Sequence, residues 1–217
     1  MKVGTDAVLL GAWANVSGVR RVLDIGTGCG VIALMLAQRT TASARIDAVE
    51  ISKPDAEQAV DNVLQSPWPA KVTVSNQPVQ SFFSAEKYDM IISNPPFFHN
   101  SQQPPNKQRH QARHTVALDH ETLVASALRL LSDAGKFNVI LPYAEGKKFI
   151  IYAQAHDLFC TRKYSFRTRI KKPIERWLLE FSRMPEPTET GEILHYDNGT
   201  NWSDTYTGLT RDFYLKL

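Results

Sequence analysis

The chain has 217 residues, of which 43% are hydrophobic, as expected for one domain with a sizeable core. No apolar run approaches the roughly 20 residues needed to cross a bilayer, and the first residues lack the pattern of a secretion signal. The formal net charge is only +3, and two distant cysteines predict neither a disulfide framework nor a zinc site. We therefore expect a soluble, cytoplasmic, monomeric single domain spanning residues 1–217, without a metal.

Short apolar runs alternate with segments of helical periodicity along most of the chain. The predicted strands are residues 21–25, 46–50, 71–74, 88–93 and 136–141, followed by 158–166 and 176–182. The predicted helices are residues 7–14, 31–39, 55–64 and 121–131, the last ending near Gly135. This alternation predicts an α/β, Rossmann-like fold with a mostly parallel seven-stranded sheet and an antiparallel C-terminal strand.

A glycine-rich loop follows the first predicted strand, where a doubly wound fold binds its cofactor. It contains Gly26, Gly28 and Gly30, which permit a tight turn and a close approach of a ligand to the backbone. Glu50 ends the second strand and can accept both ribose hydroxyls of a nucleoside. Asp24 would repel a pyrophosphate but tolerates a cationic sulfonium. The pattern therefore favours a cationic nucleoside cofactor over a dinucleotide.

A stiff tetrapeptide, Asn94-Pro95-Pro96-Phe97, follows the fourth predicted strand. Its two prolines fix φ and remove two backbone donors, so carbonyl oxygens are presented without competing N–H groups. Acceptors of this kind can hold both hydrogens of a planar amine and favour the charge that develops on its nitrogen. Phe97 offers a face on which an aromatic base can stack. A simple turn after a strand is the alternative, and the neighbouring cofactor loop makes it less favoured.

Basic residues gather in two stretches. Residues 160–183 contain eight basic and two acidic residues, and residues 99–114, within a long loop, contain three basic residues and no acid. Such stretches are either solvated surface or a site for a polyanion, and joined to an amine-transfer motif they favour RNA. The candidate contacts are Lys107, Arg109, Arg113, Lys171 and Lys172.

The glycine loop with its two acidic residues resembles class I S-adenosylmethionine-dependent methyltransferases. The resemblance implies that the loop wraps the amino-acid part of the cofactor and that Glu50 holds the ribose. It also implies that a residue after the third strand contacts the adenine, with Asn76 the candidate and Ser75 or Gln77 as alternatives. The tetrapeptide resembles the [Asn/Asp]-Pro-Pro-[Tyr/Phe/Trp] signature of amino-methyltransferases, which act on adenine N6, cytosine N4, guanine N2 or a glutamine amide.

The whole chain resembles the bacterial tRNA1(Val) adenine-37 N6-methyltransferase family, above all in residues 2–13, 111–114 and 206–215. The resemblance implies that Thr5 and Asp6 lie near the methionine end of the cofactor; the alternative is that they cap the first helix. Two features depart from the family. Phe97 stands where tyrosine is frequent, and the chain begins close to Gly4, whereas relatives carry further residues upstream.

We therefore expect methyl transfer from S-adenosylmethionine to N6 of adenine 37 in the anticodon loop of tRNA1(Val). The expected catalytic residues are Asn94, Pro95, Pro96 and Phe97, and Asn94 is also expected to contact the cofactor. The choice of tRNA follows from the resemblance alone. Two alternatives remain, a protein N5-glutamine methyltransferase and a non-catalytic RNA-binding module. The first usually brings a helical N-terminal domain that is not found here, and the intact motifs argue against the second.

Overall fold

Eight strands form one sheet in the computed structural model, which describes residues 4–96, 118–197 and 199–214. The sheet order is β3-β2-β1-β4-β5-β7-β6-β8. The strands are β1 (Arg21–Ile25), β2 (Arg45–Glu50), β3 (Val72–Asn76), β4 (Tyr88–Ser93), β5 (Leu131–Pro142), β6 (Phe159–Arg167), β7 (Arg176–Ser182) and β8 (Glu189–Leu194). Every neighbouring pair is parallel except the two that involve β7. The predicted α/β fold with a mostly parallel sheet is therefore confirmed.

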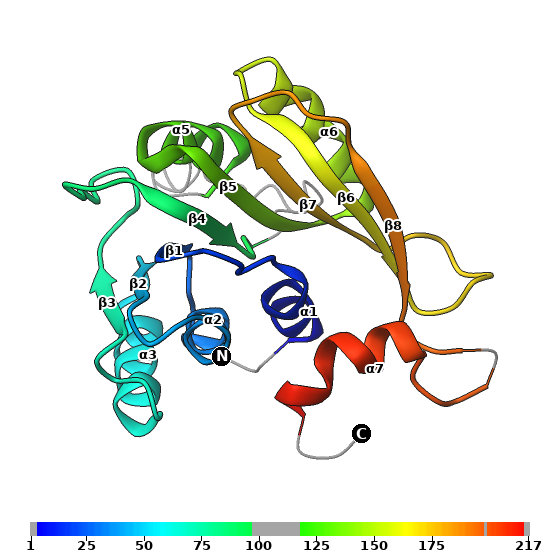
Figure 1. Ribbon diagram of the computed structural model, residues 1–217, viewed down its shortest axis with the longest axis horizontal. Coiled ribbons are helices and arrows are strands. Elements are labelled where there is room, and N and C mark those ends of the chain that lie inside the picture. Colours follow the sequence, from blue (N-terminus) through cyan, green and yellow to red (C-terminus); the bar gives the residue numbers. More distant parts are fainter. Residues whose placement is uncertain (1–3, 97–117, 198, 215–217) are drawn as a thin grey trace, which may run out of the picture.

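Helices cover both faces of the sheet (Figure 1). On one face lie α1 (Thr5–Trp13), α2 (Val31–Arg39), α3 (Lys53–Gln65) and α7 (Asp204–Thr210), which leads into a short 3-10 helix (Arg211–Phe213). On the other face lie α5 (His120–Leu130) and α6 (Tyr143–Gln154). Each face has its own cluster of buried side chains, as a sheet covered on both sides requires. None of the described helices is long and apolar enough to span a bilayer.

The sheet contains one strand more than the seven expected, because β8 pairs with β6 along the outer edge. The sequence of β8, Glu-Thr-Gly-Glu-Ile-Leu, carries only two hydrophobic residues, and only Ile193 of these is buried. A strand held mainly by backbone pairing at a sheet edge leaves little hydrophobic periodicity to detect.

Gly135 lies inside β5 and does not follow the end of a helix as expected. Helix α5 ends at Leu130 and β5 begins at Leu131, which is level with Tyr88 of β4. A Cβ on Gly135 would lie 2.8 Å from the Tyr88 carbonyl oxygen. The glycine therefore allows the close approach of β4 at an irregular point in the pairing of the two strands.

Helix α6 is not among the helices predicted from the sequence, and Gly146 lies in its middle. A Cβ on Gly146 would lie 2.7 Å from Cδ1 of Trp177, on β7. The glycine lets α6 pack directly on the indole, a contact between distant segments that no local pattern reveals.

Lys71, the residue directly before β3, stabilises the end of α2. Its Nζ donates to the carbonyl oxygens of Ala37 (2.6 Å) and Thr40 (3.0 Å) and to Thr40 Oγ1 (3.1 Å). Burial lowers the pKa of Lys71, and the nearby charge of Arg45 adds to this. The side chain therefore acts as a cap for carbonyls that a helix end leaves without partners.

Replacement of Lys71 by methionine is expected to lower the free energy of unfolding by about 1–3 kcal/mol, because buried carbonyl oxygens lose their donor. Urea denaturation measures the change. The matched control is Lys53→Met on the exposed surface of α3, which should shift the midpoint little. Equal midpoints for the Lys71 variant and the unaltered chain would show that the cap contributes nothing.

Candidate cofactor and substrate site

The carboxyl ends of the central strands bring the predicted motifs to one edge of the sheet. Ile25, the last residue of β1, is level with Val49 of β2 and with Ser93 of β4, and the Ser93 hydroxyl donates to the Ile25 carbonyl oxygen (2.8 Å). Glu50 is level with Asn76 at the ends of β2 and β3. The glycine loop, Glu50, Asn76 and Asn94 therefore leave the sheet side by side, as the order of the strands predicts.

The glycine loop adopts a backbone that other residues rarely reach. Gly26, Gly28 and Gly30 have φ angles of 71°, 58° and 84°. The loop is anchored to β2, because the N–H groups of Gly26 and Thr27 both donate to the Val49 carbonyl oxygen, at 2.8 and 3.1 Å. Gly30 is the cap residue of α2 and has no side chain to bond the first N–H groups of that helix, which favours a ligand there.

The Glu50 carboxylate is held between two loops. Its Oε2 accepts from the Gly28 N–H (2.9 Å) and its Oε1 from the Ser52 N–H (2.8 Å), and only 8% of the residue is exposed. A carboxylate offers about four acceptor positions, so each oxygen can still accept from a hydroxyl. This geometry fits the predicted hold on the two ribose hydroxyls of a nucleoside.

Asp24 is fully buried beneath the same loop. Its Oδ2 accepts from the Thr27 hydroxyl (2.6 Å), whereas Oδ1 has no hydrogen-bond partner among the described residues. Burial raises the pKa of Asp24 from 3.8 to about 7; hydrogen bonds from the Thr27 hydroxyl and from the backbone N–H of Ala33, in α2, oppose this shift, and the charge of Glu50 adds to it. A buried carboxylate with an unpartnered oxygen favours a cationic group, so the residues present fit S-adenosylmethionine. Thr27 was missed in the sequence, although a hydroxyl three positions after the acid was the available signal.

Cofactor affinity is expected to rise with pH toward a plateau above about 7, where Asp24 has lost its proton. Below that pH a cationic ligand must displace the proton, at a loss of up to roughly tenfold in affinity per pH unit. Calorimetric titration with S-adenosylmethionine between pH 6 and 8 measures this. In an Asp24→Asn variant the affinity should lose this dependence on pH. If the affinity of the variant and of the unaltered chain depends on pH in the same way, Asp24 does not bind the cationic cofactor.

The raised pKa of Asp24 also affects the stability of the protein without its cofactor. Cofactor affinity is expected to rise with pH, whereas the contribution of Asp24 to the free energy of unfolding decreases. Between pH 3.8 and about 7 the folded state binds more protons than the unfolded state, because the folded-state pKa of Asp24 is raised. The free energy of unfolding therefore falls as the pH rises through that window, as far as this residue contributes.

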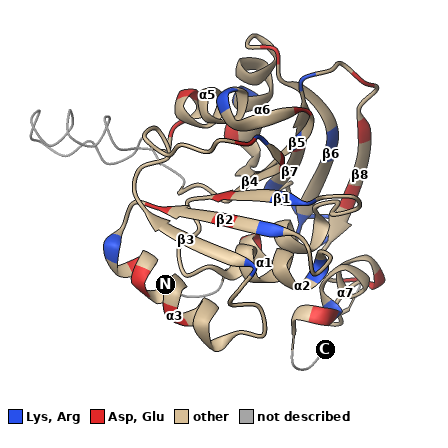
Figure 2. Ribbon diagram, turned by 60° about the vertical axis from the view of Figure 1, so that its left-hand side comes forward, with Lys and Arg blue, Asp and Glu red and all other residues tan. Residues whose placement is uncertain are grey.

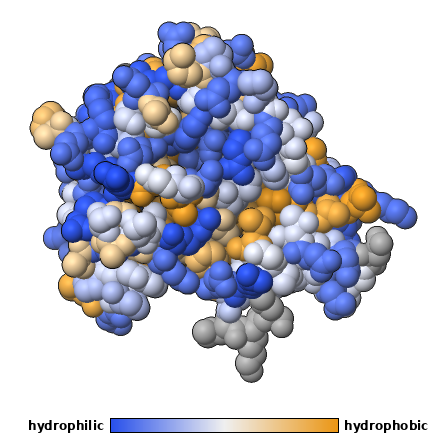
Figure 3. All heavy atoms as spheres, in the orientation of Figure 1, coloured by the Kyte–Doolittle hydropathy of each residue, from blue (hydrophilic) through white to orange (hydrophobic). Residues whose placement is uncertain are grey.

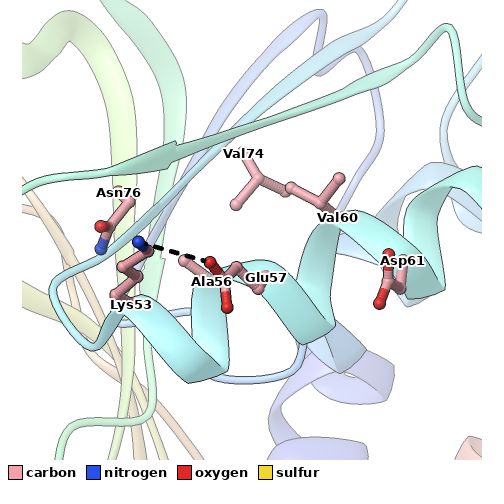
Figure 4. Close-up of a pocket in the computed structure, with 7 residues that line it drawn as sticks. All are labelled: Lys53, Ala56, Glu57, Val60, Asp61, Val74 and Asn76. Carbon is pink, nitrogen blue, oxygen red and sulfur yellow. Dashed lines mark ion pairs between the residues drawn. The ribbon is translucent and has the colours of Figure 1, made fainter.

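Asn76 ties the end of β3 to the loop after β2. Its Nδ2 donates to the carbonyl oxygens of Glu50 (2.9 Å) and Ile51 (3.1 Å), and the residue is exposed. It also lines a hollow beside α3 (Figure 4), together with Lys53, Ala56, Glu57, Val60, Asp61 and Val74. None of the glycine-loop residues lines that hollow, so the hollow is separate from the glycine loop at which the cofactor is predicted to bind. The contact of Asn76 with adenine stays a prediction.

The tetrapeptide leaves β4 directly at this edge. Asn94 is half-buried, Pro95 is buried and Pro96 is exposed. Phe97 lies outside the described residues, as do Lys107, Arg109 and Arg113. The structure thus brings Asn94 next to the end of β1, and the stacking role of Phe97 stays a prediction.

Thr5 and Asp6 form the first turn of α1, and the alternative that they cap it is wrong. The cap residue is Gly4, without a side-chain hydrogen bond. The Asp6 carboxylate instead accepts from Arg176 Nε (2.8 Å). Arg176 is level with Pro142, the last residue of β5, so this ion pair places Asp6 at the edge that carries the glycine loop. The contact of both residues with the cofactor stays a prediction.

The basic stretch 160–183 is partly neutralised within the fold, because three of its eight basic residues form ion pairs, Arg176 among them. Arg162 pairs with Glu180 and Glu189, and Arg167 pairs with Glu192. Two of these acids come from β8, the strand that was not anticipated, and Figure 2 shows its acidic residues next to the basic ones of β6. The uniformly basic surface that the sequence suggests is therefore broken up by acids from another strand.

Lys171 and Lys172 are exposed in the turn between β6 and β7. This turn follows the carboxyl end of β6 and precedes Arg176, so it lies at the same edge of the sheet as Asn94. Ile170 beside them is 55% exposed, and in Figure 3 apolar side chains gather over α1 and this turn.

Among the described residues, no cluster of histidine, cysteine, aspartate and glutamate could hold a metal ion.

Known proteins similar to this chain are methyltransferases. Residues 3–154 match the methyltransferase small domain family. The tRNA1(Val) (adenine(37)-N6)-methyltransferase of Aeromonas hydrophila is 44% identical, and that of Tolumonas auensis is 41% identical, both over 100% of this chain and 92% and 91% of their own lengths.

Among solved structures, a predicted O-methyltransferase from Agrobacterium tumefaciens superposes with a TM-score of 0.75 over 95% of this chain and 96% of its own. Its identity of 18% shows the fold alone, which is that of Rossmann-like methyltransferases. With full-length relatives at more than 40% identity, the chain belongs to the tRNA1(Val) (adenine(37)-N6)-methyltransferase family.

Proposed function

We propose that this chain transfers the methyl group of S-adenosylmethionine to N6 of adenine 37 in the anticodon loop of tRNA1(Val), in the cytoplasm. One observation carries the proposal: Asn94 and Pro95 leave β4 next to the glycine loop that leaves β1, and Ser93 bonds the two strand ends together. Relatives that cover the whole chain bear the name of this activity.

The cofactor supplies an electrophilic methyl group, and Asp24, Glu50 and the glycine loop hold it. The Asn94 side-chain oxygen and the Pro95 carbonyl accept the two hydrogens of the adenine amine and aim the nitrogen lone pair at the methyl carbon. As the carbon–nitrogen bond forms and the carbon–sulfur bond breaks, positive charge grows on the nitrogen. The two acceptors stabilise this charge, and the proton leaves afterwards to solvent. No general base is needed before attack.

In this proposal Phe97 stacks on the extruded adenine, whose removal from an anticodon loop costs less than from a duplex. The exposed residues Lys171 and Lys172 contact phosphates at the same edge, together with Lys107, Arg109 and Arg113. Most of the binding energy for RNA is then electrostatic and depends on salt.

Replacement of Lys171 and Lys172 by alanine is expected to weaken tRNA binding and to reduce the slope of log K against log salt by about 1 for each phosphate that the variant no longer neutralises. Filter binding at several salt concentrations measures both. The matched control is Lys136→Ala in the middle of β5, level with Met90 of β4, where Lys136 Nζ pairs with Glu186 at 3.0 Å. If the double variant binds tRNA with the same affinity and salt dependence as this control, the β6–β7 turn does not contact the RNA.

The proposal is tested by incubating the purified chain with methyl-tritiated S-adenosylmethionine and either total tRNA or a protein extract. Label is expected in N6-methyladenosine after nuclease digestion, and no label is expected in tRNA1(Val) carrying guanosine at position 37. Label in glutamine residues of a protein would support the N5-glutamine alternative. Cofactor binding without any transfer would favour a non-catalytic RNA-binding module.

A further inference from the structure

A stacked aromatic pair lies at the carboxyl end of β5, outside the motifs described above. Tyr143 is the first residue of α6 and Trp177 is the second residue of β7; their ring centroids are 5.7 Å apart and their planes differ by 25°. A lysine ammonium group lies over the face of each ring. Lys147 Nζ lies 4.3 Å from the Tyr143 centroid, and Lys163 Nζ lies 5.4 Å from the Trp177 centroid. These four residues are called the lysine–aromatic cluster.

The register of the strands places this cluster near the tetrapeptide. Ser93 is level with Val139 of β5, so the residues after it continue alongside the end of β5, where Leu141 is level with Trp177. Neighbouring strands lie about 4.8 Å apart, and β5 separates β4 from β7 in the sheet order. The Trp177 backbone is therefore roughly 10 Å from the line of β4, at the end from which Asn94 leaves.

The two lysines differ from their basic neighbours because neither forms an ion pair with a carboxylate of the described residues. Lys148, the next residue of the same helix, pairs with Glu145 at 2.8 Å, and Arg162, the preceding residue of the same strand, pairs with Glu180 and Glu189. Figure 2 shows basic residues on both α6 and β6. The cluster thus keeps its positive charge, whereas Lys148 and Arg162 beside it are ion-paired.

Ring faces position an ammonium group without consuming its hydrogen-bond donors. A lysine over an aromatic face is attracted by the ring quadrupole, and its N–H groups can still point outward. A carboxylate partner would both neutralise the charge and occupy a donor. The arrangement therefore suits an anion that arrives from outside, with the two ammonium groups held on adjoining rings.

We propose that the lysine–aromatic cluster binds the phosphodiester backbone of the RNA substrate beside the target nucleotide. The proposal rests on the proposed function for the identity of the RNA, and on the unpaired charge and the position of the cluster for the contact. It adds a second group of phosphate contacts, on the α6 side of the site, to those expected in the β6–β7 turn.

The test compares a Lys147→Ala/Lys163→Ala double variant with Lys148→Ala, an exposed lysine of the same helix that is ion-paired. The double variant is expected to raise the Kd for tRNA about tenfold near physiological salt and to reduce the salt slope by about 1 to 2. The affinity for S-adenosylmethionine and kcat at saturating tRNA should be unchanged. A Lys147→Arg/Lys163→Arg variant should restore binding, because arginine keeps the charge and also stacks on aromatic rings.

Two results would overturn this inference: a double variant whose tRNA affinity and salt slope match those of Lys148→Ala, or an arginine variant that binds no better than the alanine one. The unaltered chain tests the proposed function separately in the same experiment. If it methylates a protein and does not bind tRNA, both proposals fall. If the unaltered chain methylates tRNA but the double alanine variant binds tRNA as the Lys148→Ala control does, the proposed function stands and the role of the cluster in RNA binding is excluded.

Discussion

Alanine in place of Asn94 is expected to lower kcat by at least about 10²- to 10³-fold, on the scale that loss of one oriented polar group at a reacting centre produces. The affinity for S-adenosylmethionine should stay within a few-fold, because the backbone N–H groups of the glycine loop, Asp24 and Glu50 remain. The physical reason is that the Asn94 oxygen is expected to act on the amine hydrogens, whose positive charge grows only during transfer.

The measurement is single-turnover transfer to tRNA together with calorimetric titration of the cofactor. An Asn94→Asp variant is the matched control, since it retains a side-chain oxygen acceptor and should keep more activity than alanine. Equal losses of turnover and of cofactor binding in the alanine variant would mean that Asn94 is structural. A stable fold, checked by the urea midpoint, is required of both variants.

Glutamine in place of Glu50 is expected to weaken binding of both S-adenosylmethionine and S-adenosylhomocysteine by roughly 10²-fold, because hydrogen bonds to a charged acceptor contribute about 1.5–3 kcal/mol each. The two ligands share the ribose, so they should lose affinity equally. The amide nitrogen would also face the N–H of Gly28 or of Ser52, both of which now donate to the carboxylate. A modest loss of stability is therefore expected as well.

Calorimetric titration of both ligands measures the effect. Glu57→Gln is the matched control, an exposed acid on α3 whose only described ion pair is with Lys53. Affinities within twofold of the unaltered chain for the Glu50 variant would exclude the ribose role. A loss confined to S-adenosylmethionine would point to a charge effect on the sulfonium in place of a ribose contact.

Most of the strands were predictable because their signal is local. β1, β4 and β7 have the predicted bounds, and β2, β3 and β6 differ by one or two residues at their ends. Buried parallel strands are short apolar runs that end at glycine, asparagine or proline, so neighbouring residues in the chain carry the information.

The errors arose where the structure depends on contacts between distant segments. Gly135 looks like the end of a helix but allows β4 to approach β5, and Gly146, in the middle of α6, lets that helix pack on Trp177. In both cases the glycine serves a close contact in space, which its sequence neighbours do not encode.

From the sequence alone, three features could be assigned to the ends of adjacent parallel strands: the glycine loop after β1, Glu50 at the end of β2, and the tetrapeptide that begins at Asn94 after β4. Strand periodicity and the order of a doubly wound sheet bring such ends to one edge. The sequence could not show which charges remain free. Only the tertiary structure buries Asp24 with one unpartnered oxygen, neutralises Arg162 and Arg167 with acids of β8, and leaves Lys147 and Lys163 on aromatic faces. The physical reason is that charge pairing and burial depend on residues that the sheet brings together from distant parts of the chain.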